Sequence, residues 1–372
     1  MEAETNHPPV HCSSPIRLRP WRGFPTTRTY VGIGLTMQRP APPLPPSPLP
    51  ISVLTGFLGS GKTTLLARVL ACPGLTDTAV IVNEFGAVGI DHLLLEVADQ
   101  EILELPNGCV CCAVRQDLAD TLYRLLRRRA SGDLPPFRRL ALETSGLAEP
   151  SPILYTLSAD AFLEHALQVH AVVVTIDAVL GATTLDRFPE ATAQAACADR
   201  LVLTKTDLAK PSPQLLDRLA TLNPAACIDD AAAVAPASLL FGGLPGAGTR
   251  PRLVATAIHA HGIRAMVLVL RRPMSRLDFS LALGGLARER GEDLLRVKGI
   301  VAFADRSAGP AAVQAVQHTL YPPRWFDSWP DEDRRSRLVF IVRDIAPETL
   351  LEHFSAGDPV LAERIETTMG GR

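Results

Sequence analysis

The sequence predicts an α/β fold, in which a doubly wound domain with a mostly parallel sheet is followed by a smaller α+β domain. Short runs rich in Val, Ile and Leu alternate with helical patterns from residue 51 onward, as expected of parallel strands that helices cover on both faces. A Gly- and Pro-rich stretch, FGGLPGAGTRP, interrupts the alternation at 241–251. We therefore expect four segments after residue 50: a first domain at 51–240, a linker at 241–261, a second domain at 262–355 and a tail at 356–372.

The predicted strands of the first domain are short, continuous apolar runs. They lie at 51–55, 79–83, 138–142, 169–176 and 200–204. Between them, QDLADTLYRLLRRRA at 116–130 predicts a helix, because its leucines share one face and its arginines the other. In the second domain we expect strands at 265–270, 294–304 and 337–344 and helices at 277–290 and 311–321.

Residues 1–50 differ in composition from the rest of the chain. They hold 12 of the 32 prolines and show no strand or helix period, which predicts a disordered segment with polyproline character. A solvated tail is favoured over a PxxP ligand for an aromatic groove. Because Met37 precedes the first predicted strand, the sequence leaves open whether residues 1–36 belong to the mature protein, and arginines in this stretch leave organelle targeting open.

Composition limits the class of protein. The chain of 372 residues has 47% hydrophobic residues, a formal net charge of −2 and a mean hydropathy of +0.15, so it can form a large core. The charge gives no electrostatic case for nucleic acid, and no apolar run reaches the ~18 residues of a membrane span. The seven cysteines are odd in number and three are crowded together, which favours a reducing compartment, here the cytoplasm, over a disulfide framework.

The string GFLGSGKT follows the first predicted strand and precedes a helical pattern. This order is the context that a phosphate-binding P-loop requires, and it predicts a P-loop NTPase domain. The glycines let backbone N–H groups approach phosphate oxygens, Lys62 reaches the β- and γ-phosphates, and Thr63 offers a hydroxyl to Mg²⁺. The predicted nucleotide-binding residues of this segment are Gly56, Gly59, Ser60, Gly61, Lys62, Thr63 and Thr64.

Two further segments follow predicted strands, as the switch loops of a P-loop GTPase do. NEFGAVGID at 83–91 carries two glycines and two carboxylates, which suits a mobile loop that senses the γ-phosphate. LALETSGLAEP at 140–150 places Glu143 at a strand end, where a carboxylate can hold Mg²⁺ through water, and lets Gly146 approach the phosphate. Together with Lys62 and Thr63, these two residues form the predicted catalytic set. We expect hydrolysis to be slow and Mg²⁺-dependent, because no arginine finger is evident near these loops.

TKTD at 204–207 resembles the base-reading NKxD motif of GTPases. Asp207 would accept hydrogen bonds from the two guanine donors, and the stem of Lys205 would pack on the ring. A carboxylate cannot make this pair with adenine, so the motif favours GTP over ATP. Thr204 stands where Asn is usual.

The string CVCC carries three cysteines within four positions, Cys109, Cys111 and Cys112. Thiolates are soft ligands that suit Zn²⁺, and this short span needs a further ligand from elsewhere. Glu84 in the first switch segment is our candidate, because it would let the nucleotide state alter the coordination shell. A structural zinc site, a redox switch and buried inert cysteines are the competing interpretations; no second CxxC or His pair supports the first of them.

In order and spacing, GFLGSGKTT, NEFGAVGID, ELPNGCVCC, ETSGLAEP and TKTD resemble the CobW-like P-loop GTPases, a family of nucleotide-dependent metallochaperones. LLRVKGIVAF at 294–303 and RRSRLVFIVRD at 334–344 resemble the smaller domain of that family. The resemblance covers about 51–355. It implies GTP, Mg²⁺ and Zn²⁺ as cofactors, with cobalt as an alternative metal, and a client metalloprotein as partner; it leaves a homodimer open. Only His259 and His261 stand where many members carry a histidine-rich stretch.

Three function classes remain in view from the sequence. A GTP-dependent metallochaperone or insertase is favoured, because phosphate, base and thiol motifs coincide. The alternative is a P-loop kinase or phosphotransferase with a structural cysteine cluster, which would have no need of a guanine reader. The third is a GTP-gated interaction protein whose cysteines serve structure.

Overall fold

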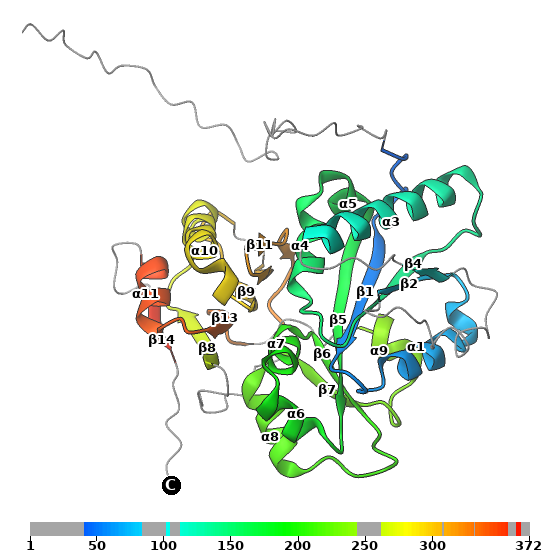
Figure 1. The fold of residues 1–372 in the computed structure, drawn as a ribbon. Helices are drawn as coiled ribbons and strands as arrows, with labels where there is room; N and C mark the ends of the chain where they lie inside the picture. The colour runs from blue at the N-terminus through cyan, green and yellow to red at the C-terminus, as the bar shows by residue number, and fades with distance from the viewer. Residues whose placement is uncertain are drawn as a thin grey trace, which may run out of the picture. The chain divides into compact units, whose positions relative to one another are not determined.

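The computed structural model describes residues 41–83, 102–104, 112–243, 262–306, 309–330, 332–355 and 362–365. The first of its two sheets has seven strands, and every pairing in it is parallel (Figure 1). In chain order the strands are β1 (Leu49–Gly56), β2 (Thr78–Asn83), β3 (Ile102–Glu104), β4 (Arg139–Thr144), β5 (Leu167–Asp177), β6 (Arg200–Thr204) and β7 (Cys227–Asp230). Their order across the sheet is β3-β2-β4-β1-β5-β6-β7.

Helices cover both faces of this sheet. They are α1 (Lys62–Leu70), α3 (Cys112–Ser131), α4 (Ser151–Ala159), α5 (Ala161–Ala166), α6 (Gly181–Arg187), α7 (Pro189–Cys197), α8 (Pro213–Leu222) and α9 (Pro236–Phe241). The apolar side chains of α1 and α9 form one core with the sheet, and those of α3 to α8 form another. The fold is therefore doubly wound, as predicted, and the carboxyl ends of β1, β4, β5 and β6 meet at one edge, where ligands bind in such folds.

The predicted strands of the first domain are confirmed as β1, β2, β4, β5 and β6. The helix predicted at 116–130 lies within α3, whose leucine stripe is buried. The first strand begins at Leu49, two residues before the predicted boundary, and residues 1–40 lie outside the described part of the chain. The predicted linker begins at the last residue of α9, Phe241, and its residues 244–261 also lie outside the described residues.

The second sheet is antiparallel. Its strands are β8 (Ile263–Leu270), β9 (Arg296–Val301), β10 (Ala311–Val316), β11 (Thr319–Leu320), β12 (Arg324–Trp325), β13 (Ser336–Arg343) and β14 (Ala362–Ile365). They lie in the order β11-β10-β9-β13-β8-β14, and β12 pairs with β10. In the described part of this region two α-helices accompany the sheet, α10 (Arg276–Arg290) and α11 (Pro347–Ser355).

Both faces of the second sheet are buried. On one face, alternate residues such as Leu268 and Phe340 pack with Phe279 of α10 and Phe354 of α11. On the other face, residues such as Ile341 belong to the same apolar core as helices α4, α7 and α8 of the first region. The α+β character of this region is as predicted.

The helix predicted at 311–321 is wrong, because this segment forms the hairpin of β10 and β11. Alanine and glutamine favour a helix by intrinsic propensity, but here tertiary pairing decides. Ala311, Val313 and Ala315 alternate into the core beneath α10, while Gln314 on the opposite face hydrogen-bonds Arg296. A period of two was therefore present in the sequence, hidden by residues with helical propensity.

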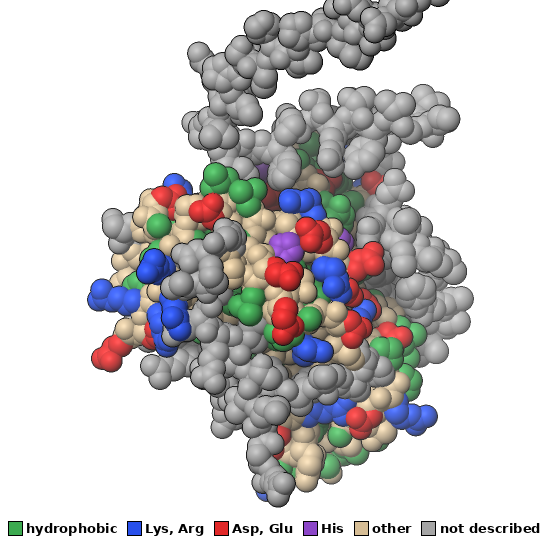
Figure 2. All heavy atoms as spheres, turned by 90° about the vertical axis from the view of Figure 1, so that its left-hand side faces the viewer, with side chains coloured by type: hydrophobic (Ala, Val, Ile, Leu, Met, Phe, Trp, Pro, Cys, Tyr) green, Lys and Arg blue, Asp and Glu red, His purple; other side chains and the backbone are tan. Residues whose placement is uncertain are grey.

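Acidic and basic side chains are interspersed on the face of the C-terminal region shown in Figure 2, and neither sign forms a continuous patch there. Among the residues that the structure describes, no helix combines the length and apolar character needed to cross a bilayer.

Candidate functional site

The loop between β1 and α1 has the compact backbone that a phosphate cradle requires. Gly56, Gly59 and Gly61 have φ values of 141°, 69° and 90°, a region that side chains disfavour. A Cβ atom on Gly56 would lie 2.3 Å from Thr175 Oγ1 at the end of β5. Ser60 Oγ also lies 2.6 Å from that hydroxyl. The loop is thus fixed against β5, and α1 begins directly after it with its N-terminus toward the site.

The side chain of Lys62 folds back onto the backbone of the loop. Its Nζ donates to the carbonyl oxygens of Gly56, at 3.0 Å, and Phe57, at 3.3 Å, and the side chain is buried. The ammonium group therefore lies over the loop, where phosphate oxygens would bind. Thr64, also predicted to bind the nucleotide, is exposed on the first turn of α1.

The two side chains predicted to hold Mg²⁺ lie in contact. The hydroxyl of Thr63 donates to Glu143 Oε1 at 2.7 Å. Glu143 is buried near the end of β4, which pairs with β1 in parallel. Hydroxyl and carboxylate oxygens are ligands that Mg²⁺ prefers, so the residues present fit this ion.

The loop that follows β4 packs on the P-loop. A Cβ atom on Gly146 would lie 2.7–2.8 Å from atoms of Leu58, so this close approach requires glycine. On its other side, the loop is held by a residue that the sequence did not reveal: Gln194 of α7 donates through Nε2 to the carbonyl oxygens of Gly146, at 3.1 Å, and Ala148, at 2.9 Å.

The TKTD segment is tied to the P-loop through its first residue. Thr204 Oγ1 donates to the Ser60 carbonyl at 2.6 Å and lies 3.2 Å from the Ile176 carbonyl. At the motif position where Asn is usual, the hydroxyl of Thr204 therefore links the end of β6 to the phosphate-binding loop. Asp207 is exposed at the same edge of the sheet.

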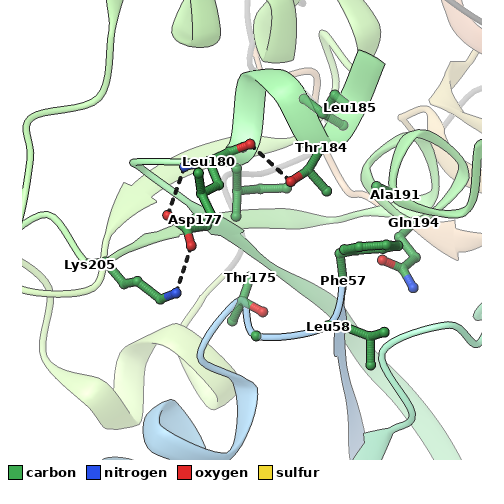
Figure 3. Close-up of a pocket in the computed structure, with 13 residues that line it drawn as sticks. Phe57, Leu58, Thr175, Asp177, Leu180, Thr184, Leu185, Ala191, Gln194 and Lys205 are labelled. Atoms are coloured by element: carbon green, nitrogen blue, oxygen red, sulfur yellow. Dashed lines mark hydrogen bonds and ion pairs between the residues drawn. The ribbon is translucent and has the colours of Figure 1, made fainter. Parts of the chain in front are cut away.

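Lys205 is held by Asp177, a second residue that the sequence did not single out for the site (Figure 3). Lys205 has a φ of 55°, and its Nζ lies 2.7 Å from Asp177 Oδ2. Asp177 Oδ1 accepts from the N–H groups of Val179 and Leu180. Burial alone would raise the pKa of Asp177, but the hydrogen bonds from Lys205 and these two N–H groups hold it below its usual value. The ion pair borders a cavity of about 110 Å³ beside Phe57 and Leu58.

Most of the predicted transition-metal ligands lie outside the residues that the structure describes. Glu84, Cys109 and Cys111 lie outside the described residues, and Cys112 is described only as the first residue of α3. The described part of the chain contains no group of three or more His, Cys, Asp or Glu side chains that could hold a metal ion. However, β2 ends at Asn83 and its parallel neighbour β3 ends at Glu104. The two strands that precede these segments in the chain therefore end at the edge of the sheet that carries the P-loop.

Comparison with known proteins agrees with this geometry. Residues 50–228 match the CobW/HypB/UreG nucleotide-binding domain, and residues 263–357 match the cobalamin synthesis protein cobW C-terminal domain. The zinc chaperone YjiA of Escherichia coli (strain K12) is 33% identical over 319 residues, which cover 83% of this chain and 98% of YjiA. The zinc chaperone CobW of Pseudomonas aeruginosa is 39% identical over 152 residues, 38% of this chain and 39% of that protein.

A solved structure shows the same fold. The crystal structure of the Zn(II)-bound YjiA GTPase from E. coli superposes with a TM-score of 0.61 at 27% identity, over 83% of this chain and 99% of that one. Both domains described above thus match known domains in the same order. The chain belongs to the CobW family of nucleotide-binding proteins.

Proposed function

We propose that this GTPase couples the binding and hydrolysis of GTP to the transfer of a transition metal, zinc, to a client metalloprotein. The observation that carries the proposal is the strand order β3-β2-β4-β1. In that order β2, whose end leads to Glu84, lies beside β4, which carries Glu143, and β3, whose end leads to the cysteines, lies beside β2. The Glu143 carboxylate accepts a hydrogen bond from Thr63. A change at the γ-phosphate can therefore reach the segments that carry the predicted metal ligands through neighbouring strands.

The chain's own residues supply most of the hydrolytic machinery. Lys62 binds the β- and γ-phosphates, and the P-loop backbone cradles them. Thr63 and Glu143 would hold Mg²⁺, which when bound neutralises charge that develops on the phosphates. Gly146 brings the backbone of its loop to the P-loop and thereby to the γ-phosphate.

Zinc as cargo is supported by the thiol chemistry and by the relatives. Cys109, Cys111 and Cys112 supply soft thiolates, and Glu84 completes the site. Relatives are named zinc chaperones and zinc-regulated GTPase metalloprotein activators. One solved structure is a Zn(II)-bound YjiA variant in which a glutamate and two adjacent cysteines are replaced by alanine. Because that variant still holds zinc, a test in this chain must count bound ions.

Replacing the three CVCC cysteines with serine is expected to remove one tightly bound zinc ion per chain, because serine does not supply the thiolate that zinc prefers. Metal analysis after removal of excess zinc measures the stoichiometry. The matched control replaces Cys72 and Cys227, which lie apart in the first domain and are half-buried, and should keep the wild-type count. An unchanged zinc count in the triple variant would contradict the proposed site.

Asp207→Asn is expected to weaken GTP binding by at least ~2 kcal/mol, because the amide presents a donor to the guanine donors. The same change should improve the binding of xanthosine triphosphate, whose base offers an acceptor there. Competition binding with GTP, ATP and xanthosine triphosphate measures both effects, and Asp217→Asn is the control for the lost charge. Equal affinity of the wild type for ATP and GTP would refute guanine recognition and favour a phosphotransferase.

A further inference from the structure

Gln194 is a buried polar residue on the apolar helix α7. Its side chain is fully buried, and its amide nitrogen donates to the carbonyl oxygens of Gly146 and Ala148. Because both partners can only accept, the amide must present its NH₂ group to the loop. One side chain therefore fixes two peptide groups of the loop that follows β4.

Those two peptide groups lie beside the P-loop. A Cβ atom on Gly146 would lie 2.7–2.8 Å from atoms of Leu58 in that loop, so the two loops approach closely. Fixing the Gly146 carbonyl also fixes the plane of the following peptide, and with it the direction of the Leu147 N–H group. In phosphoryl transfer, catalysis is almost entirely positioning and electrostatic stabilisation, so the orientation of this backbone affects turnover.

We propose that Gln194 is a positioning residue for GTP hydrolysis, acting through the backbone of residues 146–148. The inference rests on GTP hydrolysis by this chain and is independent of metal transfer. Gln194 belongs to none of the sequence motifs, and it lies 46 to 48 residues along the chain from the carbonyls that it holds.

Gln194 Oε1 is buried and has no hydrogen-bond partner among the described residues. The side chains of Gln194 and Phe57 both line the cavity shown in Figure 3. A buried acceptor without a partner loses its hydrogen bonds to water, which offsets part of the stability that the two donated bonds contribute. Substitution of Gln194 also removes the donor of two buried carbonyl oxygens, so a loss of stability is expected beside the loss of turnover.

Asn223 provides a matched control. It is a second buried amide, and its Nδ2 donates to the carbonyl oxygens of Ala195, Ala196 and Ala198 at the end of the same helix. Its Oδ1 is likewise buried without a partner in the described structure. Asn223 thus makes the same kind of contact to backbone carbonyls, but none that is described reaches residues 146–148.

The experiment compares Gln194→Met with Asn223→Leu, each measured for kcat, KM and melting temperature. Methionine keeps the length of the side chain and removes both donors. We expect Gln194→Met to lower kcat at least ~10-fold and to change KM less than ~3-fold, because misplacement near the reacting groups costs turnover. Asn223→Leu should keep kcat within ~3-fold of wild type, whereas both variants should lower the melting temperature, because each leaves buried carbonyl oxygens without this donor. Unchanged kcat in Gln194→Met, or an equal loss of kcat in both variants, overturns the inference.

Gln194→Glu provides an independent test with a nearly identical side-chain shape. A carboxylate cannot donate to either carbonyl, whereas a protonated carboxyl donates once. Burial raises the pKa of the introduced group, so the kcat of this variant relative to wild type should rise as the pH is lowered from about 8 to about 6. Wild-type kcat at every pH would overturn the inference. If Lys62→Ala abolishes hydrolysis in the same assay, such a result refutes the role of Gln194 and leaves GTP hydrolysis intact.

Discussion

Lys62→Ala is expected to abolish GTP hydrolysis. The Lys62 ammonium is buried over the P-loop and donates to two of its carbonyl oxygens, so it is already oriented toward the phosphate position. Removing a preorganised charge from the transition state of phosphoryl transfer costs at least ~10²-fold in kcat. Release of phosphate from GTP under excess Mg²⁺ measures the effect.

Lys210→Ala is the matched control for this prediction, because Lys210 is an exposed lysine of the same domain. It should hydrolyse GTP at the wild-type rate. A Lys62→Ala variant that keeps more than half of the wild-type turnover would mean that this loop does not bind the nucleotide productively.

Asp199→Ala is expected to lower the free energy of unfolding by about 3–5 kcal/mol, the cost of breaking a buried ion pair from one side. Asp199 is buried just before β6 and bonds Arg296 and Lys298 of β9 as well as the Val172 N–H group. Its removal leaves the buried Arg296 charge without this partner, between the two sheets. Urea unfolding measures the loss, and Asp305→Ala, which removes an exposed ion pair with Arg276, should change little.

The same residue predicts an acid dependence. Burial alone would raise the pKa of Asp199, but the charges of Arg296 and Lys298 outweigh it and lower the pKa to about 2. The unfolded value is about 3.9, so the folded state holds this proton less tightly. The resulting stabilisation, about 2–3 kcal/mol, is present above pH ~4 and is lost as the pH falls toward ~2. The Asp199→Ala variant should lose less stability than wild type across that interval.

Much of the fold could be predicted because parallel strands covered on both faces are continuous apolar runs. The runs at 51–55 and 138–142 became β1 and β4 with few changes of boundary. By contrast, β3 and β7 are edge strands of three and four residues, too short to show a period. The hairpin at 311–320 was predicted as a helix because its alternating buried and opposite-face positions hold alanine and glutamine, which favour helices. The strand that pairs with this segment cannot be recognised from the local sequence.

The parts of the candidate site that consist of consecutive residues could be predicted from the sequence. The P-loop, Glu143 and TKTD are contiguous motifs, and the structure brings them to one edge of the sheet. Asp177 and Gln194 could not be predicted, because their roles depend on partners that lie 28 and 46 to 48 residues away. The one available signal was that Asp177 is a carboxylate at the end of a predicted strand. A carboxylate in that position is equally typical of an ordinary helix cap.

The central claim is that the nucleotide site and the metal site are linked, and a calorimetric cycle tests it most directly. GTP affinity is measured with and without Zn²⁺, for the wild type and for the variant with serine at Cys109, Cys111 and Cys112. Linkage requires that zinc change GTP affinity by the factor by which GTP changes zinc affinity. We expect a coupling of ~1–3 kcal/mol in the wild type, about 5- to 150-fold in affinity, and none in the variant. Identical GTP affinity in all four measurements would contradict the account, because the GTPase and the thiolates would then act independently.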